Sequence, residues 1–204
     1  MEQFIIRKTL GRGSFGIVYK VRRKKDNISY ALKQINLQNK DRKCIQDSLN
    51  EIRLLASLKH PHLISFLEAF PCGRYRYNLK LCIVMEYARG GDLAKEIKKH
   101  KRLKTKIREQ IIWKYANQIS DALSFLHSHK IIHRDIKAAN CFLTSRGDIK
   151  VGDMNISKLT KHNQKARTKI GTPYYMSPEI WNYMPYDNKC DVWALGCLLY
   201  ELAT

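Results

Sequence analysis

Residues 133–140 read His-Arg-Asp-Ile-Lys-Ala-Ala-Asn, and this stretch decides how the chain is interpreted. It crowds charged and polar side chains between an apolar helical pattern on one side and the apolar residues 141–143 on the other. Packing alone does not require such a cluster. Phosphoryl transfer does require a carboxylate near the attacking hydroxyl, a cation against the transferred phosphate and an oxygen ligand for Mg²⁺. Asp135, Lys137 and Asn140 can supply these three groups, so the stretch predicts a phosphoryl-transfer loop.

The segment before this loop has the pattern of an amphipathic helix, whereas the first third of the chain alternates as strands do. Apolar residues recur at helical spacing from Ile112 to Leu126. Another helical pattern covers residues 47–59 and ends before Pro61, because proline disfavours helix at the residue that precedes it. Gly90-Gly91 marks a break, and we place a lobe boundary at residues 86–91. The predicted strands are residues 4–10, 17–22, 29–35, 63–70 and 79–87.

Two features of the strand-rich part indicate contacts to phosphate. Gly11, Gly13 and Gly16 lie between two predicted strands, and glycine lets backbone N–H groups approach phosphate oxygens because no Cβ stands in the way. An ordinary glycine hairpin would have the same pattern. Lys33 is a charged residue in an apolar strand. It is either an exposed strand lysine or a phosphate ligand that Glu51, on the predicted helix, holds in place as an ion pair.

The composition is that of a globular protein with a strong basic bias. The 204 residues include 38 basic and 18 acidic ones, which gives a net charge of +20. An acidic partner fits this charge, but lysine-rich runs such as residues 98–106 are most often solvated surface. The six cysteines have neither C-x-x-C spacing nor paired histidines, so neither a disulfide framework nor a zinc site is predicted. The chain has no signal-peptide pattern and no membrane-spanning apolar stretch, which predicts a reducing intracellular compartment.

An ordered set of motifs resembles that of the eukaryotic protein kinase superfamily, and the resemblance covers the whole chain. The order of Asp135 and Lys137, with Gly-Thr-Pro at residues 171–173 before Ser-Pro-Glu at 177–179, is similar to the Ser/Thr branch rather than the Tyr branch. Residues 83–93, 133–140 and 171–179 are most similar to the NIMA-related kinases. The matching motifs are Gly11, Gly13, Gly16, Lys33, Glu51, residues 133–140, Asp153, Pro178-Glu179 and Asp191.

The resemblance implies an α+β, bilobal protein kinase fold over residues 1–204. A β-rich N-lobe would cover residues 1–87, and a mainly helical, incomplete C-lobe would cover residues 88–204. The chain ends within the helix expected to start near Asp191, so the C-lobe is expected to be truncated there. Four leucines of that helix would then lie partly uncovered. They are Leu195, Leu198, Leu199 and Leu202.

The resemblance also implies a role for each matching residue. Asp135 would be the catalytic base, Lys137 would steady the γ-phosphate, and Lys33 would pair with Glu51. The implied Mg²⁺ ligands are Asn140 and Asp153. Met85 would be the gatekeeper beside the adenine. The implied ATP-binding residues are Leu10, Gly11, Gly13, Ser14, Gly16, Val18, Ala31, Lys33, Met85, Glu86, Ala88 and Phe142.

The activation segment contains the main departure from the family pattern. The sequence reads Asp153-Met154-Asn155, where the superfamily has Asp-Phe-Gly and the NIMA-related branch typically Asp-Leu-Gly. Methionine can fill the apolar slot, and asparagine tolerates positive φ better than most residues. We expect altered switching of the segment rather than lost metal binding. Thr168 and Thr172 belong to this segment, and a phosphate on Thr168 would order it by pairing with Arg134 and Lys158.

The implied activity is that of a non-specific protein Ser/Thr kinase that uses ATP and Mg²⁺ to phosphorylate protein hydroxyls. The charge favours acidic or cytoskeletal substrates, with no specific nucleic acid and no membrane. The implied location is the cytoplasm, with the cytoskeleton, centrosome or cilium by family resemblance. One alternative is a nucleotide-binding pseudokinase or scaffold, because of Asp153-Met154-Asn155 and the early end of the chain. Another alternative is a basic nucleic-acid-binding module. Such a module would bind DNA or RNA in a salt-dependent way, and ATP would not compete with that binding.

Overall fold

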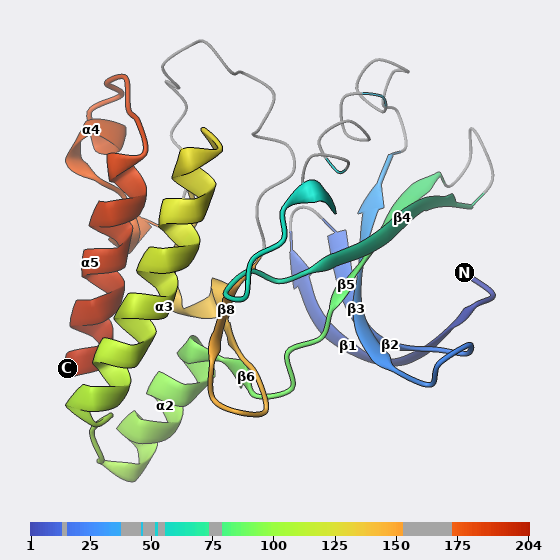
Figure 1. Cartoon of the computed structure of the whole chain (residues 1–204), viewed down its shortest axis with the longest axis horizontal. Helices are drawn as coiled ribbons and strands as arrows, with labels where there is room; N and C mark the ends of the chain where they lie inside the picture. The colour runs from blue at the N-terminus through green and yellow to red at the C-terminus, as the bar shows by residue number, and fades with distance from the viewer. Residues whose placement is uncertain (14–15, 38–45, 47–51, 53–55, 74–78, 153–172) are drawn as a thin grey trace. The chain divides into compact units, whose positions relative to one another are not determined.

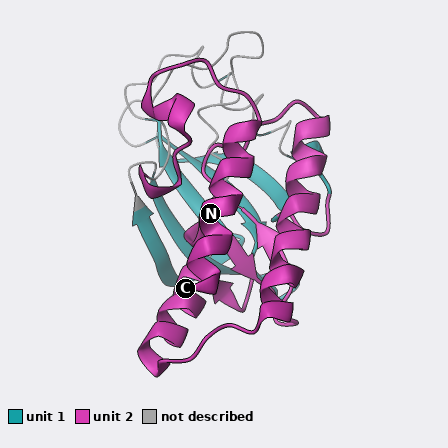
Figure 2. Ribbon diagram, turned by 90° about the vertical axis from the view of Figure 1, so that its left-hand side faces the viewer, with its two compact units in different colours: residues 1–59, 64–87 teal, residues 60–63, 88–204 magenta. Residues whose placement is uncertain are grey.

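The computed structural model describes residues 1–13, 16–37, 46, 52, 56–73, 79–152 and 173–204 (Figure 1). The chain divides into two compact units, coloured separately in Figure 2. Unit 1 contains residues 1–59 and 64–87, and unit 2 contains residues 60–63 and 88–204. The helix predicted over residues 47–59 lies largely outside the described residues. Of its apolar positions, Ile52 and Leu58 are described, and both are buried.

Unit 1 is built on an antiparallel sheet with the strand order β1-β2-β3-β5-β4. Apolar and polar residues alternate along the strands, so each strand can bury one face. The apolar residues Phe4, Val21, Leu32 and Val84 form the core of this unit together with Cys82. The strands are β1 (Phe4–Gly13), β2 (Gly16–Arg23), β3 (Ser29–Asn36), β4 (Phe66–Cys72) and β5 (Lys80–Glu86).

Residues that tolerate positive φ occupy the two tight connections between the first three strands. β1 and β2 meet with Gly13 opposite Gly16, and Gly16 has a φ of 133°. A Cβ at Gly16 would lie 1.9 Å from the carbonyl oxygen of Gln34, so only glycine fits at this position. In the turn between β2 and β3, Asn27 has a φ of 62°. Asparagine is one of the few residues that adopt this left-handed conformation readily.

The fourth strand begins later than the alternation predicts. We predicted a strand over residues 63–70, whereas β4 starts at Phe66 and continues to Cys72. Leu63 is only 1% exposed and forms an isolated parallel bridge with Val151. The N–H of Val151 also donates to the carbonyl of His62 at 2.8 Å. The prediction was wrong for Leu63 because this residue packs in unit 2, which the alternation of apolar residues cannot reveal.

Unit 2 combines a three-stranded sheet of order β6-β7-β8 with several helices. The first helix begins after Asp92, whose Oδ1 accepts a hydrogen bond from the N–H of Lys95 at 3.0 Å. It ends at Lys104, whose φ is 52°. Among the described helices, none combines the length and the apolar character needed to cross a membrane. The elements are β6 (Gly91–Asp92), α2 (Leu93–Leu103), α3 (Glu109–Ser128), η1 (Ala138–Asn140), β7 (Cys141–Leu143), β8 (Ile149–Val151), η3 (Pro173–Tyr175), α4 (Pro178–Trp181) and α5 (Lys189–Ala203).

The last helix, α5, packs against α3 within unit 2 (Figure 1). The apolar stripe predicted for α3 is confirmed, because its residues from Tyr115 to Leu126 on that stripe are buried. For α5 the prediction was wrong for Leu195, Leu198 and Leu202, which are buried, and is confirmed for Leu199, which is partly exposed. The leucines lie on the side of α5 that packs within unit 2. The exposed large side chains of this helix are Val192, Trp193 and Tyr200.

Candidate active site

The predicted phosphoryl-transfer loop, residues 133–140, lies between α3 and β7 and contains the short helix η1. Ile131, Ile136 and Ala138 within or beside it are each at most 2% exposed. Because these apolar side chains are packed into unit 2, the backbone between them has little freedom. The polar side chains of the loop are therefore held at defined positions.

Asp191, at the start of α5, holds the beginning of this loop through its carboxylate. One oxygen accepts from the N–H of His133 at 2.8 Å and the other from the N–H of Arg134 at 2.8 Å. His127, at the end of α3, contacts the same carboxylate through Nε2 at 2.9 Å. Arg134 has a φ of 65°, a conformation that costs a non-glycine residue about 1–3 kcal/mol and persists where its surroundings hold it. The buried carboxylate of Asp191 is that support.

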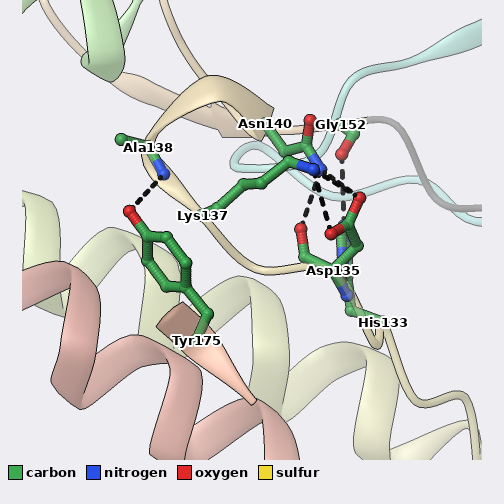
Figure 3. Close-up of polar contacts among 7 residues, drawn as sticks. All are labelled: His133, Asp135, Lys137, Ala138, Asn140, Gly152 and Tyr175. Carbon is green, nitrogen blue, oxygen red and sulfur yellow. Dashed lines mark hydrogen bonds and ion pairs between the residues drawn. The ribbon is translucent and has the colours of Figure 1, made fainter. Parts of the chain in front are cut away.

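The three side chains predicted to act in phosphoryl transfer lie together in the loop (Figure 3). Lys137 Nζ lies 3.1 and 3.0 Å from the two carboxylate oxygens of Asp135. Asn140 Nδ2 donates to the carboxylate of Asp135 at 2.9 Å and to its backbone carbonyl at 2.8 Å. The side chains of Asp135 and Lys137 remain 12% and 25% exposed. A carboxylate with a cation and an amide beside it is thus reachable from solvent.

His133 and Asn140 tie the loop to the end of β8. The N–H of Asp135 donates to His133 Nδ1 at 3.3 Å, so the ring proton of a neutral His133 lies on Nε2. That nitrogen lies 3.1 Å from the carbonyl oxygen of Gly152, to which it donates. The N–H of Gly152 donates in turn to the carbonyl of Asn140 at 2.9 Å. These bonds position the residue before Asp153, which itself lies outside the described residues.

Tyr175, in η3, is a further residue of this region, and although it lies in the matching stretch 171–179, no role was predicted for it. Its hydroxyl accepts a hydrogen bond from the N–H of Ala138 at 3.4 Å and donates to the carboxylate of Glu201 in α5. Burial and the bond to Glu201 raise the pKa of Tyr175 well above its usual range. Tyr175 therefore connects η1 to the last helix. A lone tyrosine has no sequence signal for such a role, because its partners lie far away in the chain.

The predicted ATP-binding residues of unit 1 gather on one face of its sheet. Val18 is paired with Lys33, and Ala31 is paired with Met85. Directly opposed residues, and residues two apart on one strand, share a face. These four side chains therefore lie on the face opposite the core of unit 1. Lys33 is only 7% exposed, so it is not an exposed strand lysine.

The remaining predicted residues lie in several places. Leu10 is 40% exposed on β1, and Gly11 is paired with Val18. Glu86, at the end of β5, bonds Ser65 in unit 1, where its N–H donates to the Ser65 carbonyl at 2.8 Å. Ala88 and Phe142 belong to unit 2. Predictions for Ser14, Glu51, Asp153, Met154, Asn155, Thr168 and Thr172 lie outside the described residues.

A sheet with one buried lysine, and a helical unit whose loop gathers a carboxylate, a cation and an amide, define the α+β class of bilobal phosphotransferases. Residues 4–204 match the family model described as the protein kinase domain, and the chain belongs to this family. It is 42% identical over its whole length to mouse "Serine/threonine-protein kinase Nek1", of which it covers 16%. It is 40% identical to "Probable serine/threonine-protein kinase nek2" of Dictyostelium discoideum, over 100% of this chain and 49% of that protein.

A third relative gives the same result. The chain is 38% identical to human "Serine/threonine-protein kinase Nek2", over 98% of its own length and 46% of that protein. The resemblance to the NIMA-related kinases is thereby confirmed. The chain spans at most half the length of these relatives.

Proposed function

We propose that this chain is the catalytic part of a NIMA-related protein Ser/Thr kinase, which transfers the γ-phosphoryl group of MgATP to Ser or Thr hydroxyls of proteins. The observation that supports this most is the arrangement around Asp135. Its carboxylate has Lys137 Nζ within 3.1 Å of both oxygens and Asn140 Nδ2 at 2.9 Å. One loop of eight residues, 133–140, thus contains a carboxylate that can act as base, a cation and an amide that can bind a metal, and the carboxylate and the cation are partly exposed to solvent.

In the proposed reaction, a substrate hydroxyl oxygen attacks the γ-phosphorus while the bond between that phosphorus and the bridging oxygen of ADP breaks. The hydroxyl proton passes to the Asp135 carboxylate. Lys137, which lies beside Asp135, neutralises charge on the transferred group. Positioning and charge neutralisation supply most of the rate in this class of reaction, because little covalent chemistry is left to the protein.

Asn140 is suited to a divalent metal ion. Both hydrogen bonds from its Nδ2 go to Asp135, and its amide oxygen points away from that residue (Figure 3). Mg²⁺ prefers oxygen ligands and is usually held by one or two protein groups together with substrate phosphates. Among the described residues, no group of three or more His, Cys, Asp or Glu side chains could hold a metal. We propose that Asn140 and, by the family resemblance, Asp153 would hold the metal, which would neutralise phosphate charge.

The sheet face that holds Lys33 supports the proposed nucleotide site. Val18, Ala31 and Met85 supply apolar surface for an adenine ring on that face, and the buried Lys33 supplies a cation for phosphate. Gly16 leaves its backbone without a Cβ at the hairpin between β1 and β2. An apolar wall with a few polar groups is the usual composition of a cofactor site.

Transfer of labelled phosphate from ATP to a generic protein acceptor such as casein tests the proposal. Asp135→Asn should lower kcat by about 10²–10⁴-fold, because it removes the proton acceptor. Nucleotide affinity should change little, since Asp135 is assigned to the hydroxyl and not to ATP. The matched control is Asp187→Asn. Asp187 is exposed, and the hydrogen bond that its carboxylate accepts is a local one from the N–H of Lys189 at 2.8 Å.

The outcomes separate this proposal from its alternative. Unchanged transfer by Asp135→Asn would contradict the assignment of the base. Saturable ATP binding by folded wild-type protein, without any transfer, would support the pseudokinase or scaffold reading. Failure of the folded protein to bind ATP in the presence of Mg²⁺ would contradict both.

We further propose acidic protein segments, such as those of cytoskeletal surfaces, as the partners of this kinase. The support is the basic turn, which we define as residues 98–108 between the last part of α2 and the start of α3. It contains no acidic residue, and its lysines and arginines are exposed. Of the lysines and arginines of this turn, only Lys99 has an ion pair with a described carboxylate, that of Glu96 at 3.3 Å, and His100 lies 3.3 Å from the same carboxylate. The basic residues are Lys98, Lys99, Lys101, Arg102, Lys104, Lys106 and Arg108.

Binding of a glutamate-rich peptide, titrated at two salt concentrations, tests this partner class. Lys101→Glu with Lys104→Glu should weaken binding and reduce its salt dependence, because fewer charges are neutralised. Lys24→Glu with Lys25→Glu makes the same change of charge on an exposed turn of unit 1 and should leave binding nearly unchanged. Equal weakening by both pairs would assign the effect to net charge alone.

We propose a cytoplasmic location with concentration at the cytoskeleton, centrosome or cilium. The support is the resemblance to NIMA-related kinases together with the basic turn. Imaging of the tagged protein beside tubulin tests this, and an even cytosolic distribution that the basic-turn variant shares would contradict it.

A further inference from the structure

Two cysteines of unit 1 lie in direct contact on neighbouring strands. Cys72 ends β4 and Cys82 lies in β5, and their sulfur atoms are 2.8 Å apart. In the antiparallel register Cys72 faces Lys80 and Cys82 faces Phe70, so the two thiols are diagonal neighbours on one face. A disulfide bond is about 2.0 Å long, so closing one requires the sulfurs to approach by about 0.8 Å. The spacing of the two cysteines in the sequence does not predict this contact, because the pairing register of β4 with β5 brings them together.

The surroundings of the pair differ for the two sulfurs. Cys82 is fully buried in the core of unit 1, whereas Cys72 is partly exposed at its edge. Burial, followed by the contact with Cys72, raises the pKa of the Cys82 thiol to about 12. Gln34 Nε2 lies 3.8 Å from each sulfur and donates toward both. Of the two cysteines, Cys72 is therefore the one that is accessible to solvent, and the buried Cys82 thiol stays protonated.

The β4–β5 hairpin can also accommodate a bond between them. Pro71 precedes Cys72 and is paired with Leu81. β4 is the edge strand of the sheet and pairs only with β5, so a small shift at its end disturbs fewer ladder hydrogen bonds than the same shift in a central strand would. The pair lies on the core face of the sheet, opposite the face proposed for the nucleotide, and is near Lys33 only along the strands, because Gln34 follows Lys33 and Cys82 precedes Ile83, the partner of Lys33.

We propose that Cys72 and Cys82 form a reversible disulfide when the protein meets a hydroperoxide, which makes this pair a redox modification site separate from the phosphoryl-transfer loop. The bond would join β4 to β5 covalently. It would restrict the hairpin next to the strand that holds Lys33. The proposal concerns unit 1 alone and holds whether or not the kinase activity is as proposed.

The chemistry proceeds in two balanced steps. The Cys72 thiolate attacks one peroxide oxygen; an S–O bond forms, the O–O bond breaks, and the leaving oxygen takes up a proton as water or an alcohol. The Cys82 sulfur then attacks the sulfenic sulfur of Cys72, so that the S–S bond forms and the S–O bond breaks. The Cys82 proton leaves with the hydroxide as water. The two thiols lose two electrons, and these reduce the peroxide.

Tryptic mapping after hydrogen peroxide treatment tests the proposal directly. Trypsin places Cys72 in the peptide of residues 60–74 and Cys82 in the peptide of residues 81–89, with no other cysteine in either. We expect these two peptides to appear as one species, two hydrogens lighter than their sum, which dithiothreitol separates. On a non-reducing gel the protein should stay monomeric, since the bond forms within one chain. Hydrogen exchange should slow in Phe66–Cys72 and Lys80–Glu86.

Three variants serve as controls. Cys72→Ala and Cys82→Ala should each abolish the linked species. Cys197→Ala should retain it, because Cys197 in α5 has no thiol contact among the described residues. The wild-type map is decisive even if Cys82→Ala fails to fold. Sulfinic acid on Cys72 without any linked peptides, or two thiols that stay fully alkylatable after peroxide, would overturn the proposal.

Discussion

Asp191 is the single residue on which the start of the phosphoryl-transfer loop depends most. It is 1% exposed and accepts from two backbone N–H groups at 2.8 Å and from His127 at 2.9 Å. Asp191→Asn keeps the shape but removes the charge and turns one acceptor into a donor. We predict a loss of about 2–4 kcal/mol in the free energy of unfolding, because charged acceptors of buried donors are among the costliest to remove.

Urea unfolding of both proteins measures this loss as a shift of the midpoint at constant slope. Asp187→Asn is the control, because Asp187 lies near the start of the same helix but is exposed. The free energy of unfolding of that variant should lie within about 0.5 kcal/mol of the wild-type value. A midpoint for Asp191→Asn equal to that of the control would show that the loop holds Arg134 in its positive-φ conformation without Asp191.

Of the residues at this site, the motif predicted those that lie close to one another in the sequence. Asp135, Lys137 and Asn140 lie within one short loop, so their types and spacing were enough to bring them together. The supports of the loop could not be predicted in this way. His127 and Tyr175 contact it from other elements, and a single histidine or tyrosine has no spacing that indicates such a contact.

The hairpin between β2 and β3 depends on the carboxylate of Asp26. Its oxygens accept from Arg23 Nε at 2.9 Å, the Tyr30 hydroxyl at 3.1 Å and the N–H of Ile28 at 3.0 Å. The hydrogen bond from Arg23, more than any other contact, lowers the pKa of Asp26 well below its usual range. The folded state therefore binds this proton less tightly than the unfolded state, whose Asp pKa is about 3.9. The stabilisation is present above that value and is lost as the pH falls through the folded-state pKa.

We predict that Asp26→Asn loses less stability than the wild type when the pH falls from about 5 to about 2. Urea midpoints at both ends of that range measure the difference. Tyr30→Phe is the intermediate case and should keep most of the wild-type pH dependence, because it leaves the bond from Arg23 in place. The same acid dependence in wild type and Asp26→Asn would show that Asp26 does not stabilise this hairpin.

Elements with a strong period were predicted from sequence, and those that depend on a distant partner were not. β1, β2, β3 and α3 have alternating or helical apolar patterns long enough to be recognised. β6 is only two residues long and exists because Gly91 and Asp92 pair with β7. The leucines of α5 were predicted to lie partly uncovered, yet Leu195, Leu198 and Leu202 are buried. An apolar helix pattern shows that one face is buried but not which element covers it.

The chain as a whole combines a net charge of +20 with an apolar groove on unit 2. The groove has a volume of about 580 Å³ and is lined by residues of η3 and α5. Trp193 is 48% exposed and Tyr200 is 74% exposed along this side of α5. Like charge keeps copies of a protein apart, whereas an exposed apolar patch draws them together once salt screens that charge. We therefore predict that self-association of this chain increases with salt and depends on the groove.

Tyr200→Glu should reduce this self-association, measured by sedimentation velocity at low and high salt, because it places a carboxylate in the apolar groove. The free energy of unfolding should stay within about 0.5 kcal/mol of the wild-type value, since an exposed side chain contributes little to stability. Ile6→Glu adds the same charge at an apolar residue of β1 that is 48% exposed and is not part of the groove. Equal reduction by the two variants would assign the effect to charge and not to the groove. Leu198→Glu, at a residue that is 0% exposed, should instead unfold the protein, because it buries a charge without a partner.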